Sequence, residues 1–246
     1  MAYDGYAALR IDVRGKIAYV TIDNPPVNVI TAELYGDLMR LSFELEADDS
    51  LLVVVFRSAN PDFFIAHFDA NALLGMTIEG EPSRDGQNIS SEYHAMCERF
   101  RTLDKVTIAQ IEGRIGGGGS EFSMALDMRF GVLGKTIVNQ MEVPLGILPG
   151  GGGTQRLPRM VGRGRAMEVI LGGVDLHADE AERWGYLNRA FAPGRIGPYV
   201  EWLASRIASF PVEAVRLTKK SIDASEMELA EGLREEAYLF QRLMGT

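Results

Sequence analysis

The 246-residue sequence has one cysteine, Cys97, and no apolar run that approaches the roughly 20 residues of a membrane span. A single cysteine excludes an intramolecular disulfide. Residues 1–16 contain no basic region leading into an apolar core, so we expect no signal peptide. These absences predict a cytoplasmic protein without membrane insertion.

Basic residues are also scarce relative to acidic ones. Lysine and arginine number 25 against 34 aspartates and glutamates, which gives a formal charge of −9. Broad nucleic-acid binding needs a basic face, so we expect no nucleic-acid partner. An anionic small ligand stays possible, because backbone amides and a few cations can hold one.

Several motifs of catalysis and nucleotide binding are missing as well. Residues 116–119 are all glycine but lack the Lys-Ser/Thr ending of a phosphate-binding loop, and no G-x-G-x-x-G occurs. Ser120 is not a hydrolase nucleophile of the G-x-S-x-G type, because Phe122 occupies the last position. No metal-ligand spacing links His94 with His177, so we expect no metal site.

No Pro/Ser-rich linker, charge run or internal repeat divides the chain. The soft polar stretch 77–88 is interpreted as a mobile loop inside one domain. Apolar patterns predict strands at 8–13, 17–23, 51–56 and 106–111, and helices at 31–48, 90–102 and from 120 to 126. The last third is predicted to be mainly helical, at 163–171, 178–184, 197–209, 212–224 and 226–243. This alternation predicts an α/β layered fold.

Two glycine-rich segments carry the chemistry. GGGGSE joins a glycine turn to Glu121, and QMEVPLGILPGGGGTQRL, from 140 to 157, contains Glu142. Glycine lets a ligand approach backbone amides, which can stabilise an oxygen that becomes negative during reaction. A carboxylate nearby can move protons or position water. Together the segments suggest an enzyme that forms and quenches an enolate.

Commoner explanations exist for both features. A glycine cluster often marks only a tightly packed strand-to-helix turn. A lone glutamate is usually a solvated surface group, and Glu121 could merely complement a helix N-terminus. Periodicity does not show that Glu121 and Glu142 converge.

Four segments in order resemble the enoyl-CoA hydratases of the crotonase superfamily. They are DNPPVNVIT, FFIAHFDANAL, IEGRIGGGGSEFSMALDMRF and QMEVPLGILPGGGGTQRLPRMVG, and the resemblance covers nearly the whole chain. It implies a crotonase-like α/β spiral of ββα units over 1–190 and a C-terminal helical trimerisation region over 191–246, continuous with that core. It also implies an acyl-CoA substrate, whose coenzyme A is part of that substrate, no separate cofactor, and a homotrimer or a hexamer.

The same resemblance assigns the catalytic roles. The backbone N–H groups of Phe68 and Gly118 would form the oxyanion hole. Glu121 would orient or activate water, Glu142 would exchange a proton with the substrate, and Gly150 would help to hold the water.

The resemblance further places Pro26, Val27, Ala66 and His67 in the substrate-binding region. His67 is a departure, because the family commonly has glycine there, and its side chain could narrow the channel or add a proton-transfer group. Phe68 is also bulky where a small residue is frequent.

Three functions therefore stay open at the level of sequence. The first is a 2-enoyl-CoA hydratase. The second is an isomerase or another enolate reaction, such as decarboxylation or thioester hydrolysis. The third is an acyl-CoA-binding relative without turnover.

Overall fold

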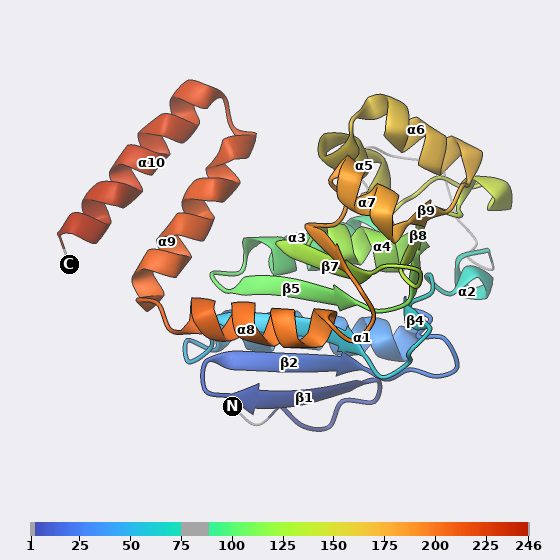
Figure 1. Cartoon of the computed structure of the whole chain (residues 1–246), viewed down its shortest axis with the longest axis horizontal. Coiled ribbons are helices and arrows are strands. Elements are labelled where there is room, and N and C mark those ends of the chain that lie inside the picture. The colour runs from blue at the N-terminus through green and yellow to red at the C-terminus, as the bar shows by residue number, and fades with distance from the viewer. Residues whose placement is uncertain (1–2, 75–88, 246) are drawn as a thin grey trace.

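The computed structural model describes residues 3–74 and 89–245 of the chain. The loop predicted at 77–88 lies outside these described residues. Two sheets organise the described part, as Figure 1 shows. The larger sheet has the order β1-β2-β3-β5-β7-β10, and the smaller has the order β4-β6-β8-β9.

The larger sheet begins with the predicted hairpin. β1 (Leu9–Arg14) and β2 (Ile17–Ile22) pair antiparallel, and every later strand of this sheet joins in parallel. Those later strands are β3 (Val53–Ser58), β5 (Val106–Ile111), β7 (Met128–Val132) and β10 (Arg189–Phe191). β3 starts two residues after the predicted strand 51–56, at the point where its pairing with β2 begins.

The smaller sheet consists of very short strands. β4 (Phe63–Ile65), β6 (Arg114–Gly116) and β8 (Ile137–Asn139) run parallel, and β9 (Leu176–His177) closes the sheet antiparallel. Each of β4, β6 and β8 follows a strand of the larger sheet along the chain. This alternation between two sheets, with intervening helices, confirms the α/β class.

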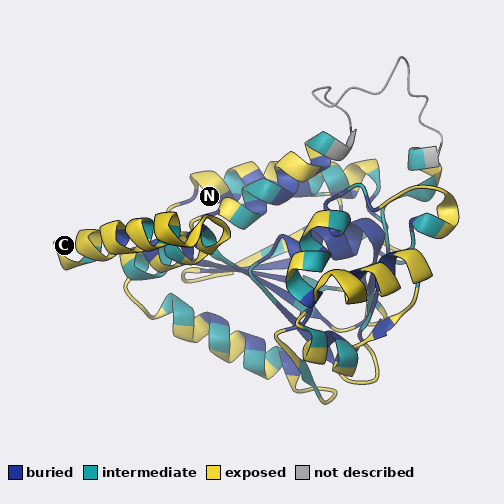
Figure 2. Cartoon of the chain, turned by 90° about the horizontal axis from the view of Figure 1, so that it is seen from above, coloured by how far each residue is buried: buried dark blue, intermediate teal, exposed yellow. Residues whose placement is uncertain are grey.

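Helices cover both faces of the larger sheet, as the edge-on view in Figure 2 shows. On one face, α1 (Ala32–Ala47) buries Leu34, Leu38, Leu41 and Leu45, which recur at helical spacing. Its N-cap is Thr31, whose side chain accepts a hydrogen bond from the Leu34 amide. On the other face, α8 (Ile196–Ala208) packs against β2, β3, β5 and β7.

The remaining helices lie beside α1, around the smaller sheet or at the C-terminus. They are α2 (Ala70–Leu74), α3 (Ile89–Thr102), α4 (Gly117–Met124), η1 (Val143–Leu145), α5 (Gly153–Val161), α6 (Arg163–Gly172) and α7 (Ala178–Trp184), followed by α9 (Val212–Asp223), η2 (Ala224–Glu226) and α10 (Leu229–Met244). α4 starts three residues before the predicted helix at 120. None of the helices in the described ranges is long and apolar enough to cross a membrane.

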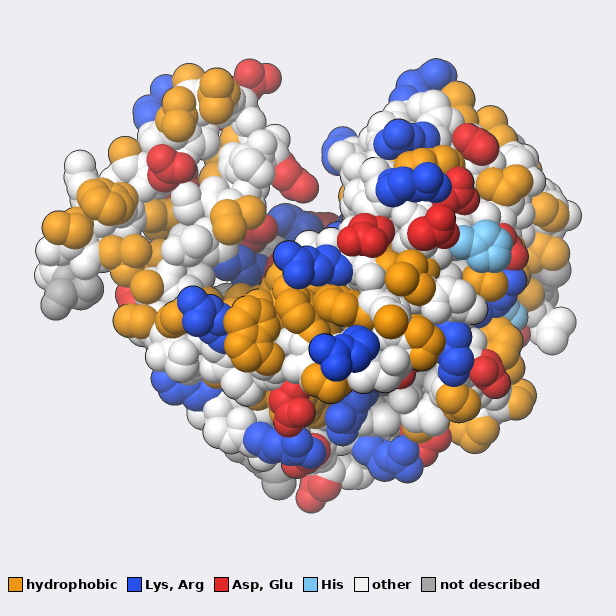
Figure 3. Space-filling view, in the orientation of Figure 1, with side chains coloured by type: hydrophobic (Ala, Val, Ile, Leu, Met, Phe, Trp, Pro, Cys, Tyr) orange, Lys and Arg blue, Asp and Glu red, His pale blue; other side chains and the backbone are white. Residues whose placement is uncertain are grey.

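α9 and α10 form an arm that extends beyond the two sheets (Figure 1). Much of the arm is exposed, including Leu229, Leu233 and Phe240, each with more than half of its surface accessible. Apolar side chains are therefore visible on this arm in Figure 3. Leu239 is buried within the chain, and packing of the arm on another subunit stays a prediction.

Candidate active site

A cavity of about 420 Å³ opens where the smaller sheet meets α4, η1 and the loop before α5. One part of its wall is polar and is built from glycine backbone and two carboxylates. The rest is mainly apolar. The lining residues are His67, Phe68, Ala70, Leu73, Tyr93, Gly117, Gly118, Glu121, Met141, Glu142, Leu145, Ile147, Leu148, Gly150 and Gly151.

The glycine run after β6 serves both packing and the cavity. A side chain at Gly119 would come within 2.6 Å of Ile65, so this glycine permits close packing on β4. Gly118 lines the cavity, and a Cβ there would lie 3.1 Å from the Phe68 Cβ. Gly118 is also in the first turn of α4, where amides have no acceptor inside the helix. Close packing therefore accounts for Gly119, whereas Gly118 is the glycine that lines the cavity.

Phe68 faces Gly118 from the segment after β4. It forms a parallel bridge with Ile30, in which His67 O and the Asp69 amide make the two hydrogen bonds. In such a bridge the amide of the central residue points away from its partner strand. The Phe68 N–H therefore makes no hydrogen bond with Ile30.

Glu121 is buried on α4, with 3% of its surface exposed. Its Oε1 accepts hydrogen bonds from the amides of Gly151 and Gly153, both at 2.8 Å. Burial raises the pKa of Glu121 above its ordinary value, and the two amides act against this rise. The backbone therefore fixes one carboxylate oxygen of Glu121, Oε1, whereas Oε2 accepts from neither of these two amides.

Glu142 precedes η1 and is 7% exposed. Burial, followed by the negative charge of Glu121, raises the pKa of Glu142 to about 7. Gln140 Nε2 donates to both carboxyl oxygens of Glu142, at 3.2 and 3.3 Å. With a pKa near neutrality, Glu142 has both a protonated and an ionised population at pH 7 and can act as acid or base.

His67 occupies the edge of the cavity beside this carboxyl group. A Cβ built at Gly117 would be 3.4 Å from His67 Cβ and 3.2 Å from Glu142 Oε1, so both lie beside the same glycine. His67 Nδ1 is 2.7 Å from the Phe68 carbonyl oxygen. Because that oxygen only accepts, Nδ1 carries the hydrogen and Nε2 is left for other contacts.

Most of the predicted site residues come together. Phe68, Gly118, Glu121, Glu142, Gly150 and His67 all line the one cavity. Pro26, Val27 and Ala66 do not line it. The Ala66 amide donates to Val27 O at 3.2 Å, which places these two residues side by side behind His67. Their contact with coenzyme A stays a prediction.

Four contributors were not identified from the sequence. Tyr93 on α3 donates its hydroxyl hydrogen to Gly118 O at 2.7 Å and so supports the first turn of α4. Gln140 holds Glu142, and the amides of Gly151 and Gly153 hold Glu121. Gln140, Gly151 and Gly153 lie inside the second glycine-rich segment, whereas Tyr93 had no local signal in the sequence.

In the part of the chain that the structure describes, no group of three or more His, Cys, Asp or Glu side chains is arranged to hold a metal ion.

Comparison with known proteins places this cavity in a family context. Residues 12–246 match the family model described as enoyl-CoA hydratase/isomerase. The chain is 33% identical over 244 residues to "Probable enoyl-CoA hydratase" of Rhizobium meliloti (strain 1021), covering 98% of this chain and 91% of that protein. It is also 33% identical over 215 residues to the short-chain-enoyl-CoA hydratase of Clostridium acetobutylicum, covering 87% and 80%.

Solved structures agree with the architecture. The enoyl-CoA hydratase of Bacillus anthracis superposes with a TM-score of 0.89 at 28% identity, covering 98% of this chain and 92% of that one. The two sheets and C-terminal helices of this chain therefore form the crotonase fold that the sequence resemblance implied.

Proposed function

The chain belongs to the enoyl-CoA hydratase/isomerase family, and we propose that it adds water across the 2,3 double bond of a 2-enoyl-CoA thioester. The product would be a 3-hydroxyacyl-CoA. One observation carries this proposal: Glu121 and Glu142, both nearly buried, line the same cavity. Hydration needs one group to direct water and another to supply a proton, and this pair offers both.

The backbone would activate the substrate. Phe68 and Gly118 both line the cavity, and in the proposed complex their amides donate to the thioester carbonyl oxygen. This withdraws electrons from the conjugated double bond and makes C3 electrophilic. The same donors stabilise the enolate oxygen once water has added. In oxyanion holes of this type, removal of one donor lowers the rate by about 10²–10³-fold.

The carboxylates would handle the protons. Glu121 accepts a proton from water while the water oxygen bonds to C3, and the double-bond electrons move toward the thioester oxygen. Protonated Glu142 then donates its proton to C2 as the enolate collapses. The proton on Glu121 then passes to Glu142, either directly or by release to solvent with uptake of another proton by Glu142. This restores ionised Glu121 and protonated Glu142.

The surroundings of the two carboxyl groups suit these roles. The amides of Gly151 and Gly153 hold Glu121 in one orientation and stabilise its ionised form. The pKa of about 7 keeps a protonated population of Glu142 available at neutral pH. In the proposed complex, Gly150 helps to hold the water, while Pro26, Val27, Ala66 and His67 contact the substrate.

This proposed reaction consists of water addition and proton transfer, and it calls for no metal or redox cofactor. Coenzyme A is part of the substrate. Assembly into a trimer or hexamer and a cytoplasmic location remain predictions.

Turnover of a panel of enoyl-CoA thioesters tests the proposal directly. Short, medium and aromatic 2-enoyl-CoA compounds are incubated with the enzyme, and added water is detected by mass. We expect hydration by wild type and its loss in both Glu121→Gln and Glu142→Gln. Saturable binding without hydration across the panel would reject a hydratase for these substrates.

An isomerase is the second candidate, because one carboxyl group with a pKa of about 7 suffices to move a proton between two carbons. In that case Glu142→Gln would be inactive, whereas Glu121→Gln would retain substantial double-bond isomerisation. The same two variants, assayed with 3-enoyl-CoA thioesters, therefore separate the two reactions.

A further inference from the structure

The turn that holds Glu121 is itself held from the outside by an arginine. Arg156, in the first turns of α5, folds back so that its Nη1 donates to Gly151 O at 3.4 Å. Its guanidinium also lies directly against Gly152. Gly152 adopts φ +111°, a conformation that favours glycine.

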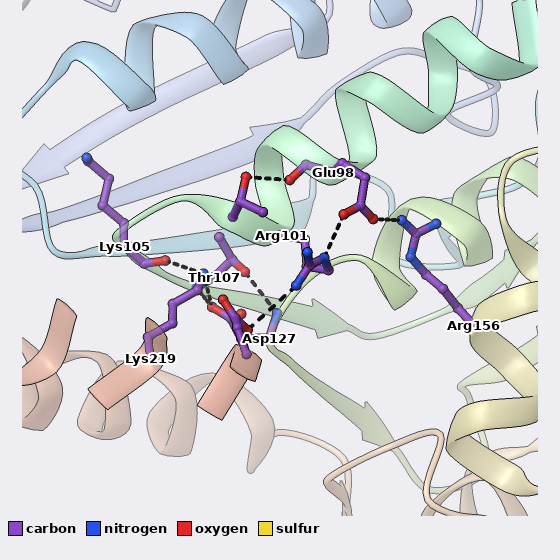
Figure 4. Close-up of polar contacts among 9 residues, drawn as sticks. Glu98, Arg101, Lys105, Thr107, Asp127, Arg156 and Lys219 are labelled. Carbon is purple, nitrogen blue, oxygen red and sulfur yellow. Dashed lines mark hydrogen bonds and ion pairs between the residues drawn. The ribbon is translucent and has the colours of Figure 1, made fainter. Parts of the chain in front are cut away.

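Arg156 is fixed in turn by α3. Its Nη2 forms an ion pair with Glu98 Oε1, and Glu98 Oε2 accepts from Arg101 Nε at 2.8 Å. Figure 4 shows Glu98 between the two guanidinium groups. The Arg156 side chain is 17% exposed and that of Glu98 is 46% exposed, so the ion pair is shielded from solvent on the arginine side only.

This arrangement connects α3 to the catalytic carboxylate in three contacts. Glu98 holds Arg156, Arg156 holds the carbonyl of Gly151, and the amide of Gly151 donates to Glu121. Arg156 itself does not line the cavity. Any effect of Arg156 on the reaction must therefore act through the 151–153 turn or through the positive charge of the guanidinium.

We propose that Arg156, clamped by Glu98, is a positioning residue that fixes the 151–153 turn and thereby the orientation of Glu121. The inference rests on the proposed function in that it assigns Glu121 a role in directing water. The guanidinium is suited to this task because its planar fork serves a carboxylate on one side and a carbonyl on the other. Lysine offers a compact ammonium without that fork.

The test uses three variants at the clamp and a control on the same helix. Arg156→Met removes the charge and the fork, Arg156→Lys keeps the charge, and Glu98→Gln weakens the hold on Arg156. The control is Arg159→Met, because Arg159 is exposed and, among the residues that the structure describes, donates only to Gln155 O of its own helix.

Hydration kinetics should separate positioning from substrate binding. A displacement of about 1 Å in a catalytic group can cost on the order of 10²-fold in rate. We expect kcat of Arg156→Met to fall by about 10- to 100-fold while KM stays within about twofold, since Arg156 does not reach the cavity. Arg156→Lys and Glu98→Gln should give smaller losses of kcat, and Arg159→Met should match wild type.

A second readout does not depend on turnover. Tyr93 and Cys97 from α3, Glu142 before η1 and Arg156 from α5 are ionisable groups that interact electrostatically with Glu121. Among them, the positive charge of Arg156 favours the ionised form of Glu121. Carboxyl-carbon NMR titration should thus show a higher pKa of Glu121 in Arg156→Met than in wild type, with the resonance identified by its loss in Glu121→Gln.

The outcomes distinguish failure of this inference from failure of the proposed reaction. If wild type hydrates no substrate, the titration of Glu121 still decides whether Arg156 controls it. An unchanged titration and unchanged kcat in folded Arg156→Met would overturn the inference. Should Arg156→Met fail to fold, Arg156→Lys and Glu98→Gln decide instead: wild-type kcat in both would equally refute the clamp.

Discussion

Replacing Glu142 by glutamine should make the protein more stable at alkaline pH, although the variant is expected to be inactive. The folded protein raises the pKa of Glu142 from 4.5 to about 7, mainly because the carboxyl group is buried. Ionised Glu142 is therefore less favourable in the folded chain than in the unfolded chain. Glutamine has nearly the same shape and cannot ionise.

The sign and size follow from proton linkage. Below pH 4.5 the carboxyl group is protonated in both states and makes no difference. Between 4.5 and about 7 the unfolded chain releases the proton first, so stability falls as pH rises; above 7 both states are ionised and the loss is complete. The full shift corresponds to about 3 kcal/mol, of which about 2–3 kcal/mol develops between pH 5 and pH 8.

Urea unfolding at several pH values measures this directly. The free energy of unfolding of Glu142→Gln minus that of wild type should increase by about 2–3 kcal/mol from pH 5 to pH 8. Comparing differences cancels most of the titration of other groups. Glu236→Gln, an exposed glutamate on α10, is the control and should show no such trend. A difference for Glu142→Gln that stays constant with pH would refute the assigned burial of its charge.

Two further substitutions test contacts around and away from the cavity. Tyr93→Phe removes the 2.7 Å hydrogen bond to Gly118 O, and we expect kcat/KM to fall by about tenfold, equivalent to about 1.4 kcal/mol, in steady-state hydration assays. Wild-type kinetics would show that Tyr93 does not support the oxyanion donor. Lys219→Met removes the part-buried bond to Asp127 and the buried bond to Lys105 O, and it should lower the free energy of unfolding by about 3 kcal/mol in urea. Lys220→Met, at an exposed neighbour, should change it by less than about 1 kcal/mol. Equal effects of the two lysine variants would contradict the difference in burial.

Elements long enough to show a periodic pattern could be predicted from sequence, because the spacing of their apolar residues defines the buried face. The strand at Val106–Ile111 and the helix at Ala178–Trp184 have the predicted bounds. The strands of the smaller sheet were missed, because segments of three residues are too short to show alternation. Their pairing comes from tertiary context and not from local pattern.

α4 shows how burial overrides propensity. Glycine is a poor helix former, so the sequence favoured a start at Ser120, yet the helix begins at Gly117. Every residue of α4 is buried, and a side chain at Gly119 would meet Ile65. The absence of side chains, which weakens the isolated helix, is what allows this helix to pack so closely.

Surface position was harder to predict than helical content. Trp202 lies in the helix predicted at 197–209, and it is 54% exposed. It lies on the outer side of α8, next to Tyr199 and Arg206. The apolar periodicity predicted the helix correctly, but it did not show whether another part of the chain would cover the Trp202 side chain.

The candidate site was predictable in its parts and not in its assembly. Glu121 and Glu142 could be selected because each accompanies a glycine-rich turn. That the amide of Gly151, 30 residues after Glu121, would hold its carboxylate is a tertiary fact with no local signal. The convergence left open by the sequence is thus supplied by α4 and the loop before α5.

The order of strands in the two sheets has a consequence for how the chain can be built during synthesis. Along the larger sheet, β1, β2, β3, β5, β7 and β10 stand in the order in which they leave the ribosome, and β4, β6, β8 and β9 do the same in the smaller sheet. Each new strand therefore meets a partner that has already emerged, so both sheets can grow at one edge without threading. Lys219, which contacts Asp127 across 92 residues, can join only after this growth is complete.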